Sequence, residues 1–222
     1  MSYYKLKDRI FHHSEKFKAL IESQSDVELM ETDDYGWENY RYESPLFRLA
    51  HVERYSHMGL EVVHITCFPH KNSKAPIFGF DVVGYQNDEK ETSKVSGVFI
   101  DCSPVMYEEK WHDTTWNKDR KLPVWATVFS ENFIAVRPTE DEYEKIFEVG
   151  FKAFENYIKK LNSLDDITND EDEITQIIEN QNIYCEHQAS NKRTFGALQA
   201  NIGKEKAKFF MEEVLFPKIK TI

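Results

Sequence analysis

The chain has 222 residues, of which 41% are hydrophobic and 14% aromatic, and its formal net charge is −11. This length and composition suit a single large domain with a substantial core, and we expect that domain to span residues 1–222. The acidic balance argues against general binding to nucleic acid or to anionic membranes, because both require a positive field.

The cysteines, and the lack of any apolar segment typical of a signal peptide or a membrane span, suggest where the protein acts. Cys67, Cys102 and Cys185 are far apart and form no CxxC motif, which predicts a reducing compartment with no disulfides and no zinc knuckle. The N-terminus lacks the apolar core of a signal peptide, and no stretch of 18 apolar residues occurs. We therefore expect a soluble, monomeric, cytoplasmic protein.

The N-terminal half predicts one helix followed by a sheet. Apolar residues recur at helical spacing over residues 10–23, and an irregular segment follows over residues 31–40. Short apolar runs separated by polar turns then indicate strands of an antiparallel meander. These runs cover residues 46–55, 60–69, 76–85, 95–104, 124–130 and 133–138.

The C-terminal part reads as helical. Thr139 is a candidate cap for a helix over about residues 139–164, and two more helices are expected near 173–188 and 204–215. Several strands are apolar on both faces, as in a sheet that is covered on both sides. The fold class predicted is α/β, a three-layer α/β/α sandwich with a central antiparallel sheet flanked by helices.

Two titratable residues interrupt otherwise apolar strands in the segment "VVHITCFPHKNSKAPIFGFDVVG", residues 62–84. If the two runs form a hairpin around "KNSK", His64 lies opposite Asp81, and both side chains point to the same face. A slip of one residue would place them on opposite faces. A buried Asp–His pair is also often purely structural, so both interpretations stay open.

The preceding hairpin adds a third titratable group. A turn through "SHMG" pairs Tyr55 with Leu60 and places Glu53 opposite Val62, one step from His64 on the same face. Three such groups on one covered face would perturb each other's pKa values and would suit acid–base chemistry. Taken alone, Glu53 is equally typical of a solubilising residue on an edge strand.

Other chemistries have weaker support. The spacing of His51, His57, His64 and His70 invites a metal site, but His57 and His70 fall in expected turns, and there is no HExxH motif. The glycines form neither GxGxxG nor GxxxxGK[ST], so we predict no metal and no bound nucleotide cofactor. Electrons for any redox reaction would then come from a partner protein.

Basic residues gather in "WNKDRKLP" and near the C-terminal end. One interpretation is ordinary solubility and compensation of helix dipoles. The alternative is that they clamp carboxylates and form a docking surface for an acidic partner.

Five segments together resemble the ferredoxin-dependent bilin reductases. They are "PLFRLAHVE", "LEVVHITCFPHKNSKAPIFGFDVVG", "GVFIDCSP", "LPVWATVFSENFIAVRP" and "NIYCEHQASNKRTFGALQANIGKEKAKFFMEEVLF", and they extend from about residue 45 to 216. The resemblance is strongest to the phycocyanobilin-forming branch and its phage-borne relatives that form phycoerythrobilin. It implies an α/β/α sandwich that binds biliverdin IXα between the sheet and the C-terminal helices. It also implies single-electron transfers from a [2Fe–2S] ferredoxin through bilin radicals, with no redox cofactor bound to the enzyme.

The resemblance implies catalytic roles for the three titratable residues expected on one face of the sheet. Asp81 would deliver a proton to the bilin, His64 would hydrogen-bond a terminal-ring oxygen and relay protons, and Glu53 would serve reduction of the D-ring vinyl group.

The resemblance also implies a set of substrate-binding residues. Ser96, Arg120 and Arg193 match positions that hold the propionates, which suits bidentate contact between arginine and carboxylate. Asn191 is retained from the family's helix motif, but Lys192 stands where the family often has aspartate, which bears on the second two-electron step.

The leading functional hypothesis is a net four-electron reduction of biliverdin IXα to phycocyanobilin or phycoerythrobilin. The ferredoxin would dock at a local basic patch that includes Lys192, Arg193 and the lysines of the last helix. The alternatives are a non-catalytic tetrapyrrole carrier and a two-electron bilin reductase.

Overall fold

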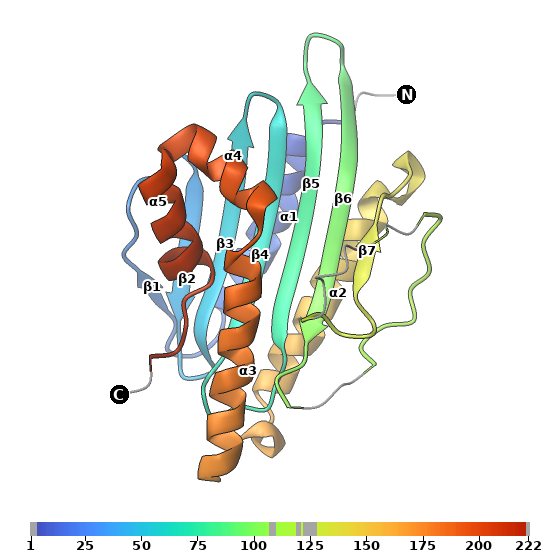
Figure 1. Ribbon diagram of the computed structural model, residues 1–222. Coiled ribbons are helices and arrows are strands. Elements are labelled where there is room, and N and C mark those ends of the chain that lie inside the picture. The colour runs from blue at the N-terminus through green and yellow to red at the C-terminus, as the bar shows by residue number, and fades with distance from the viewer. Residues whose placement is uncertain (1–3, 107–109, 119–120, 122–127, 221–222) are drawn as a thin grey trace.

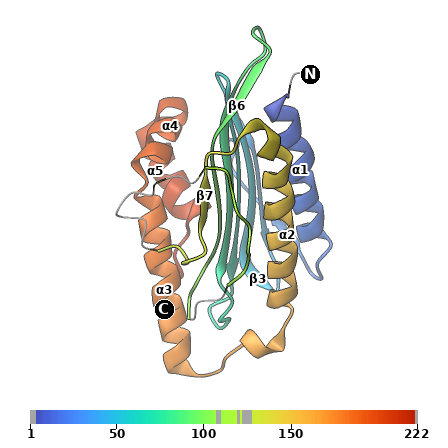
Figure 2. The ribbon, with the colours of Figure 1, turned by 90° about the vertical axis from the view of Figure 1, so that its right-hand side faces the viewer.

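The computed structural model describes residues 4–106, 110–118, 121 and 128–220. One antiparallel sheet forms the middle layer, and helices cover both of its faces (Figures 1 and 2). The strands follow one another in chain order across the sheet, as expected of a meander. They are β1 (Glu28–Met30), β2 (Glu38–Glu43), β3 (Phe47–His57), β4 (Leu60–Pro69), β5 (Ile77–Asn87), β6 (Thr92–Ser103) and β7 (Ile134–Val136).

Two helices cover one face of the sheet. They are α1 (Leu6–Glu22) and α2 (Tyr143–Leu161), and α2 follows the short 3-10 turn η1 (Glu140–Glu142). The expected capping residue is confirmed, because the Thr139 backbone N–H donates to Glu142 Oε2 at 3.0 Å. The apolar stripes of both helices pack on the inward side chains of β3 to β6 and form the larger core cluster.

The opposite face is covered by the C-terminal helices. They are α3 (Glu171–Ala189), α4 (Lys192–Ile202), α5 (Lys204–Phe209) and the π-helical turn η3 (Phe210–Leu215), and the 3-10 turn η2 (Leu164–Asp166) connects α2 with α3. Figure 2 shows these helices on one side of the sheet and α1 and α2 on the other. The predicted three-layer α/β/α sandwich is confirmed.

Buried polar groups attach α3 to the sheet. Arg48 Nε donates to Gln181 Oε1 at 2.9 Å, and Arg48 Nη1 donates to the Pro217 carbonyl at 2.9 Å. The same guanidinium lies over the Phe68 ring, 4.5 Å from its centroid. These contacts hold the C-terminal layer against this face of the sheet.

Several expected boundaries differ from the structure. The first helix begins at Leu6 rather than residue 10, and β2 begins at Glu38, inside the segment 31–40 that was expected to be irregular. Strand β1 forms where no element was predicted. Helix α4 was not predicted, because Leu198 is its one fully buried residue and its apolar pattern is therefore weak. Of the expected strand over residues 124–130, residues 124–127 lie outside the described part, and 128–130 form no strand.

Candidate active site

Three titratable side chains occupy directly opposed positions on adjacent strands. Glu53 of β3 pairs with His64 of β4, and His64 pairs with Asp81 of β5. Opposed residues of antiparallel strands point to the same face, which here is the face under the C-terminal helices. We call Glu53, His64 and Asp81 the acid–base row.

The β4–β5 register agrees with the register predicted from the sequence, whereas the β3–β4 register corrects the prediction. Glu53 lies opposite His64 rather than Val62, and Tyr55 lies opposite Val62 rather than Leu60. The turn is tighter than expected: Met58 and Gly59 form it with φ values of 49° and 81°, and both strands continue up to it. A shift of two residues keeps Glu53 on the same face and brings it beside His64.

His64 and Asp81 form a short hydrogen bond. The distance from His64 Nδ1 to Asp81 Oδ1 is 2.5 Å. His64 is 9% exposed, whereas the Asp81 side chain is 32% exposed. Burial lowers the pKa of His64, but the Asp81 carboxylate, its hydrogen bond and Glu53 together outweigh burial, so the His64 pKa is raised above 6.5. The pair therefore favours an imidazolium beside a carboxylate.

Glu53 is the most enclosed member of the row, at 5% exposure. Burial raises its pKa to about 7, against the opposing influence of His64 and of a hydrogen bond from Trp37. A carboxyl group with a pKa near neutral pH can both donate and accept a proton under physiological conditions. Glu53 and the His64–Asp81 pair thus provide two kinds of proton donor within one row.

Further polar groups line the same face without a partner. His64 Nε2, His51 Nδ1, Asn39 Nδ2 and Thr66 Oγ1 are buried and make no hydrogen bond within the described part of the chain. The register places His51 opposite Thr66 and Asn39 opposite Glu53, so all four groups lie on the site face. Because an unpaired buried polar group costs about 1–3 kcal/mol, such a cluster suits a polar ligand that pairs with it.

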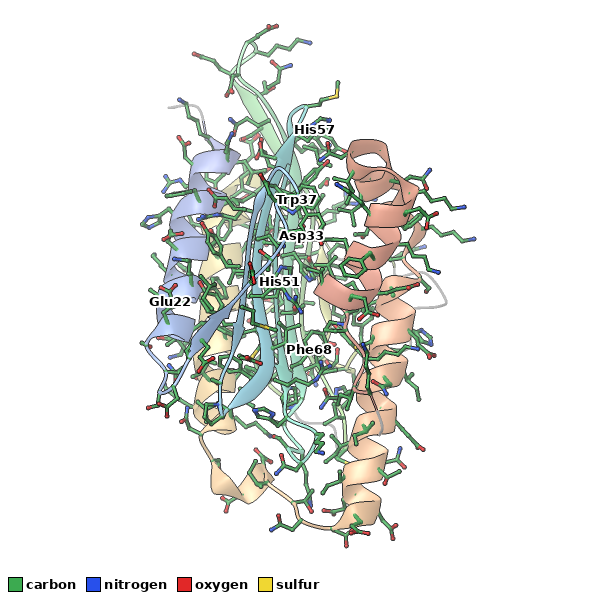
Figure 3. All side chains as sticks on the ribbon, turned by 90° about the vertical axis from the view of Figure 1, so that its left-hand side faces the viewer. Glu22, Asp33, Trp37, His51, His57 and Phe68 are labelled. Carbon is green, nitrogen blue, oxygen red and sulfur yellow. The ribbon has the colours of Figure 1, made fainter. Side chains whose placement is uncertain are left out.

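Aromatic side chains from the helical layer and from the β1–β2 loop cover the row. Phe216 packs edge-on against His64 with centroids 5.8 Å apart, and Phe210 contacts Trp37 at 5.2 Å. The Tyr184 hydroxyl lies over Gly79, 3.6 Å from where a Cβ would be. Figure 3 shows Trp37, His51 and Phe68 along the side of the sheet that faces the C-terminal helices. The surroundings are therefore apolar and aromatic, with polar groups on the sheet below.

A third carboxyl group on this face was not predicted as a site residue. Asp101 lies opposite Gly79 on β6 and is 3% exposed. It accepts hydrogen bonds at 2.5 Å from the hydroxyls of Ser103 and Ser130 and at 3.0 Å from the Ser130 backbone N–H. Burial raises its pKa to about 6, although these bonds oppose the change. Asp101 therefore fastens the chain before β7 to the sheet.

The described residues that were expected to bind the substrate lie in two places, on β6 and at the start of α4. Ser96 forms a bulge in β6 and donates its hydroxyl to the Val83 carbonyl at 3.0 Å. Asn191 caps α4 by accepting from the backbone N–H groups of Arg193 and Thr194 at 3.1 and 3.4 Å. Lys192 and Arg193 are exposed in the first turn of α4. Arg120 lies outside the described residues.

An exposed basic surface follows α4 and α5. We define this basic surface as five exposed residues, Lys192, Arg193, Lys204, Lys206 and Lys208. Within the described residues, none of these five side chains makes an ion pair. By contrast, Lys218 and Lys220 pair with Glu186 and Glu213. Lys206 also lines a cavity of about 400 Å³, together with Tyr35 and Asn201.

Trp37 is the contributor that sequence reasoning missed most completely. It lies in the β1–β2 loop, where no periodic pattern reports burial, and its indole donates to Glu53 at 2.7 Å. The only available signal was an aromatic residue within the polar segment "DDYGWENY".

In the described part of the chain, no group of three or more His, Cys, Asp or Glu residues could hold a metal ion. No helix there is long and apolar enough to span a bilayer.

Comparison with known proteins identifies relatives along most of the chain. A family model described as "Ferredoxin-dependent bilin reductase" matches residues 13–217. Phycocyanobilin:ferredoxin oxidoreductase from a Synechococcus species is 28% identical over 195 residues, which cover 81% of this chain and 75% of the relative. The protein of the same name from Trichodesmium erythraeum is 25% identical over 193 residues, with the same coverage.

Two solved structures share the fold. The structure of PcyX superposes with a TM-score of 0.63 at 23% identity, covering 96% of this chain and 98% of that one. The structure of phytochromobilin synthase from tomato, in complex with biliverdin, gives a TM-score of 0.64 at 19% identity and covers 96% and 83% of the two chains. The family match spans nearly the whole sandwich, acid–base row included. The chain belongs to the ferredoxin-dependent bilin reductases, a family of oxidoreductases.

Proposed function

We propose that this protein reduces biliverdin IXα to a phycobilin, phycocyanobilin or phycoerythrobilin, with four electrons from [2Fe–2S] ferredoxin. The observation that carries the proposal is the acid–base row, which lies on the face under the C-terminal helices of a chain that belongs to this family. Each two-electron reduction also consumes two protons, so the complete reaction needs four protons. The row supplies donors of the required type.

In the proposed mechanism, the electrons arrive one at a time and the row delivers the protons to the bilin radicals. The His64 imidazolium keeps its Nδ1–H on Asp81, which leaves Nε2–H free to bond an oxygen of a terminal bilin ring. Asp81 is the more exposed partner: it takes the Nδ1 proton of His64 and passes it toward the pyrrole nitrogens, and solvent then reprotonates the pair. Glu53 donates in the second reduction.

The bilin's two propionates would be held by basic and hydroxyl side chains. Arg193 and Lys192 are exposed at the start of α4, and Ser96 lies in the bulge of β6. Arg120, which lies outside the described residues, completes this proposed set. The aromatic cover above the row would exclude water from the reacting rings.

Two residues bear on which product forms, and they favour different products. Glu53 completes the acids needed for reduction of the D-ring vinyl group and favours phycocyanobilin. Lys192, in place of an expected aspartate, favours the second candidate function, a reductase that stops after two electrons. We retain the four-electron reaction because Glu53 is buried beside His64, with a pKa near neutrality.

Ferredoxin would dock on the basic surface of α4 and α5. The five cations of that surface make no ion pairs within the described residues, so they remain available to an acidic partner despite the net charge of −11. We further propose that the enzyme is a cytoplasmic monomer with no redox cofactor of its own.

Anaerobic turnover tests the function. The protein is mixed with biliverdin IXα and chemically or enzymatically reduced ferredoxin, and the bilins are separated by chromatography. The expected result is consumption of biliverdin and a product that elutes with phycocyanobilin or phycoerythrobilin. An accumulating two-electron product would establish the second candidate. Binding of biliverdin without consumption would leave only a carrier and would refute the proposal.

A further inference from the structure

Trp37 makes a direct polar contact with the most enclosed acid of the site. Its indole Nε1 donates to Glu53 Oε1 at 2.7 Å. Within the described residues this is the one side-chain hydrogen bond to Glu53, and Oε2 has none. The two carboxyl oxygens of Glu53 are therefore distinguished by their surroundings.

The Trp37 ring is fixed by three aromatic neighbours from different parts of the fold. Tyr55 of β3 and Phe210 of η3 pack edge-on against it, each with centroids 5.2 Å apart, and Tyr35 of the same loop lies at 5.6 Å. Phe210 is fully buried. The indole cannot turn away from Glu53 without displacing these rings, so the direction of its N–H is preorganised.

We infer that Trp37 is a positioning residue for Glu53: its N–H holds Oε1 and leaves Oε2 as the oxygen that carries the transferable proton. This inference rests on the proposed function and extends it. In the second reduction, the electrons come from ferredoxin and the proton passes from Glu53 Oε2 to the bilin radical, which leaves a carboxylate. The indole bond, already in place on Oε1, stabilises that carboxylate, so the proton transfer becomes more favourable.

Other titratable groups also face Glu53 and set the background against which Trp37 acts. The strands bring His64 and Asp81 beside it, and η3 places the apolar Phe210 against Trp37. Further groups on this face are His51, Tyr55, Arg41 and Tyr35. Of these neighbours, His64 lowers the pKa of Glu53 and Asp81 raises it, while the Trp37 hydrogen bond lowers it. Removing the indole N–H should therefore raise the pKa of Glu53.

The first test needs no turnover. The carboxyl titration of Glu53 is followed by difference infrared spectroscopy and is assigned by its loss in Glu53→Gln. In Trp37→Phe, which keeps an aromatic ring but lacks the N–H, we expect the midpoint to rise by about one pH unit. Trp116→Phe is the matched control, because the Trp116 N–H is buried without a partner and that variant should leave the midpoint unchanged.

A second measurement remains decisive if Trp37→Phe fails to fold. In the wild-type protein, the indole N–H resonance of Trp37 should titrate with the midpoint of Glu53, and this dependence should vanish in Glu53→Gln. An indole resonance that is indifferent to pH, or a Glu53 midpoint unchanged in Trp37→Phe, would overturn the inference and reduce Trp37 to a packing residue.

Turnover then connects the contact to the reaction. For Trp37→Phe we expect about tenfold slower conversion of the two-electron intermediate at neutral pH, and an alkaline limb of its pH–rate profile moved upward by about one unit. The first two-electron reduction should keep its rate. If the wild-type protein consumes no bilin, the proposed function fails, while the spectroscopic titrations still decide whether Trp37 controls Glu53.

Discussion

His64 lies between two carboxyl groups, and its protonation state depends on Asp81. The carboxylate of Asp81 and the 2.5 Å hydrogen bond favour the imidazolium, against the effect of burial. In Asp81→Asn this support is lost, so the pKa of His64 should fall below its wild-type value. Imidazole titration by NMR measures the change.

Asp101→Asn is the matched control for that titration. Asp101 is also a buried carboxyl group on the site face, but its hydrogen bonds go to Ser103 and Ser130 rather than to a histidine. Its replacement should leave the His64 titration in place. Equal behaviour of His64 in both variants would show that its charge does not depend on the row.

Glu53 should make the stability of the fold depend on pH. Its pKa is 4.5 in an unfolded chain and about 7 in the folded protein, because burial disfavours the carboxylate. The stabilisation is therefore complete below pH 4.5 and is lost as the pH rises to about 7. In Glu53→Gln, the loss of unfolding free energy between these pH values should shrink by on the order of 3 kcal/mol. Urea unfolding at pH 4.5 and 7.5 measures it, and identical pH profiles of the two proteins would contradict this.

At the residue scale, the sequence could predict which residues of the acid–base row share a face, but not the aromatic side chains that pack over them. The polar positions of His64 and Asp81 in apolar strands, with the length of the turn between them, specified a register that the structure confirms. The predicted position of Glu53 is on the correct face but two residues from the observed register, because the Met58–Gly59 turn is tighter than the predicted turn. Trp37 could not be placed, since loop residues carry no periodicity that reports their contacts.

Helix α2 packs on the sheet through a glycine. A Cβ at Gly150 would lie 2.5 to 3.0 Å from ring atoms of Phe80, which is fully buried. Phe80 is held between Phe17, at 5.2 Å, and Phe147, at 6.2 Å, and has no room to retreat. Gly150→Ala should therefore destabilise the protein by about 1–3 kcal/mol, measured by chemical unfolding.

Gly196 provides the matched control on another helix. It lies within α4, and a Cβ there would meet nothing within 4 Å. Gly196→Ala should leave the stability unchanged or raise it by up to about 1 kcal/mol, because alanine favours the helix. If both variants were equally stable, close contact between α2 and β5 would not be what glycine provides at position 150.

At the element scale, strongly patterned segments were predictable and weakly patterned ones were not. The apolar stripe of α2 and the short apolar runs of β3 to β6 identified those elements, since each buries side chains along its length. Strand β1 has three residues and no buried side chain, and α4 has one buried residue. Their formation depends on neighbours that a local pattern does not contain.

At the scale of the whole molecule, a basic surface stands out against an acidic chain. We expect Lys204, Lys206 and Lys208 to attract an acidic ferredoxin, so changing all three to Glu should lower kcat/KM for ferredoxin by at least about tenfold at low salt. The effect should shrink as ionic strength rises, because salt screens exposed charges. Steady-state turnover over a range of salt concentrations measures both.

A triple variant of the opposite layer controls for net charge. Changing Lys16, Lys152 and Lys159, which are exposed on α1 and α2, to Glu alters the total charge by the same amount. This variant should retain most of the wild-type kcat/KM for ferredoxin. Equal losses in the two variants would show that overall charge, and not the α4–α5 surface, governs the encounter.

The central claim is that the acid–base row supplies protons for bilin reduction, and single turnover of Asp81→Asn tests it most directly. Wild-type and variant protein, each loaded with biliverdin, are mixed anaerobically with reduced ferredoxin, and bilin absorbance is followed in time. Both should bind biliverdin, and the variant should form reduced bilin at least about 100-fold more slowly, as expected when a general acid is removed. Formation of the wild-type product at the wild-type rate by Asp81→Asn would contradict the account.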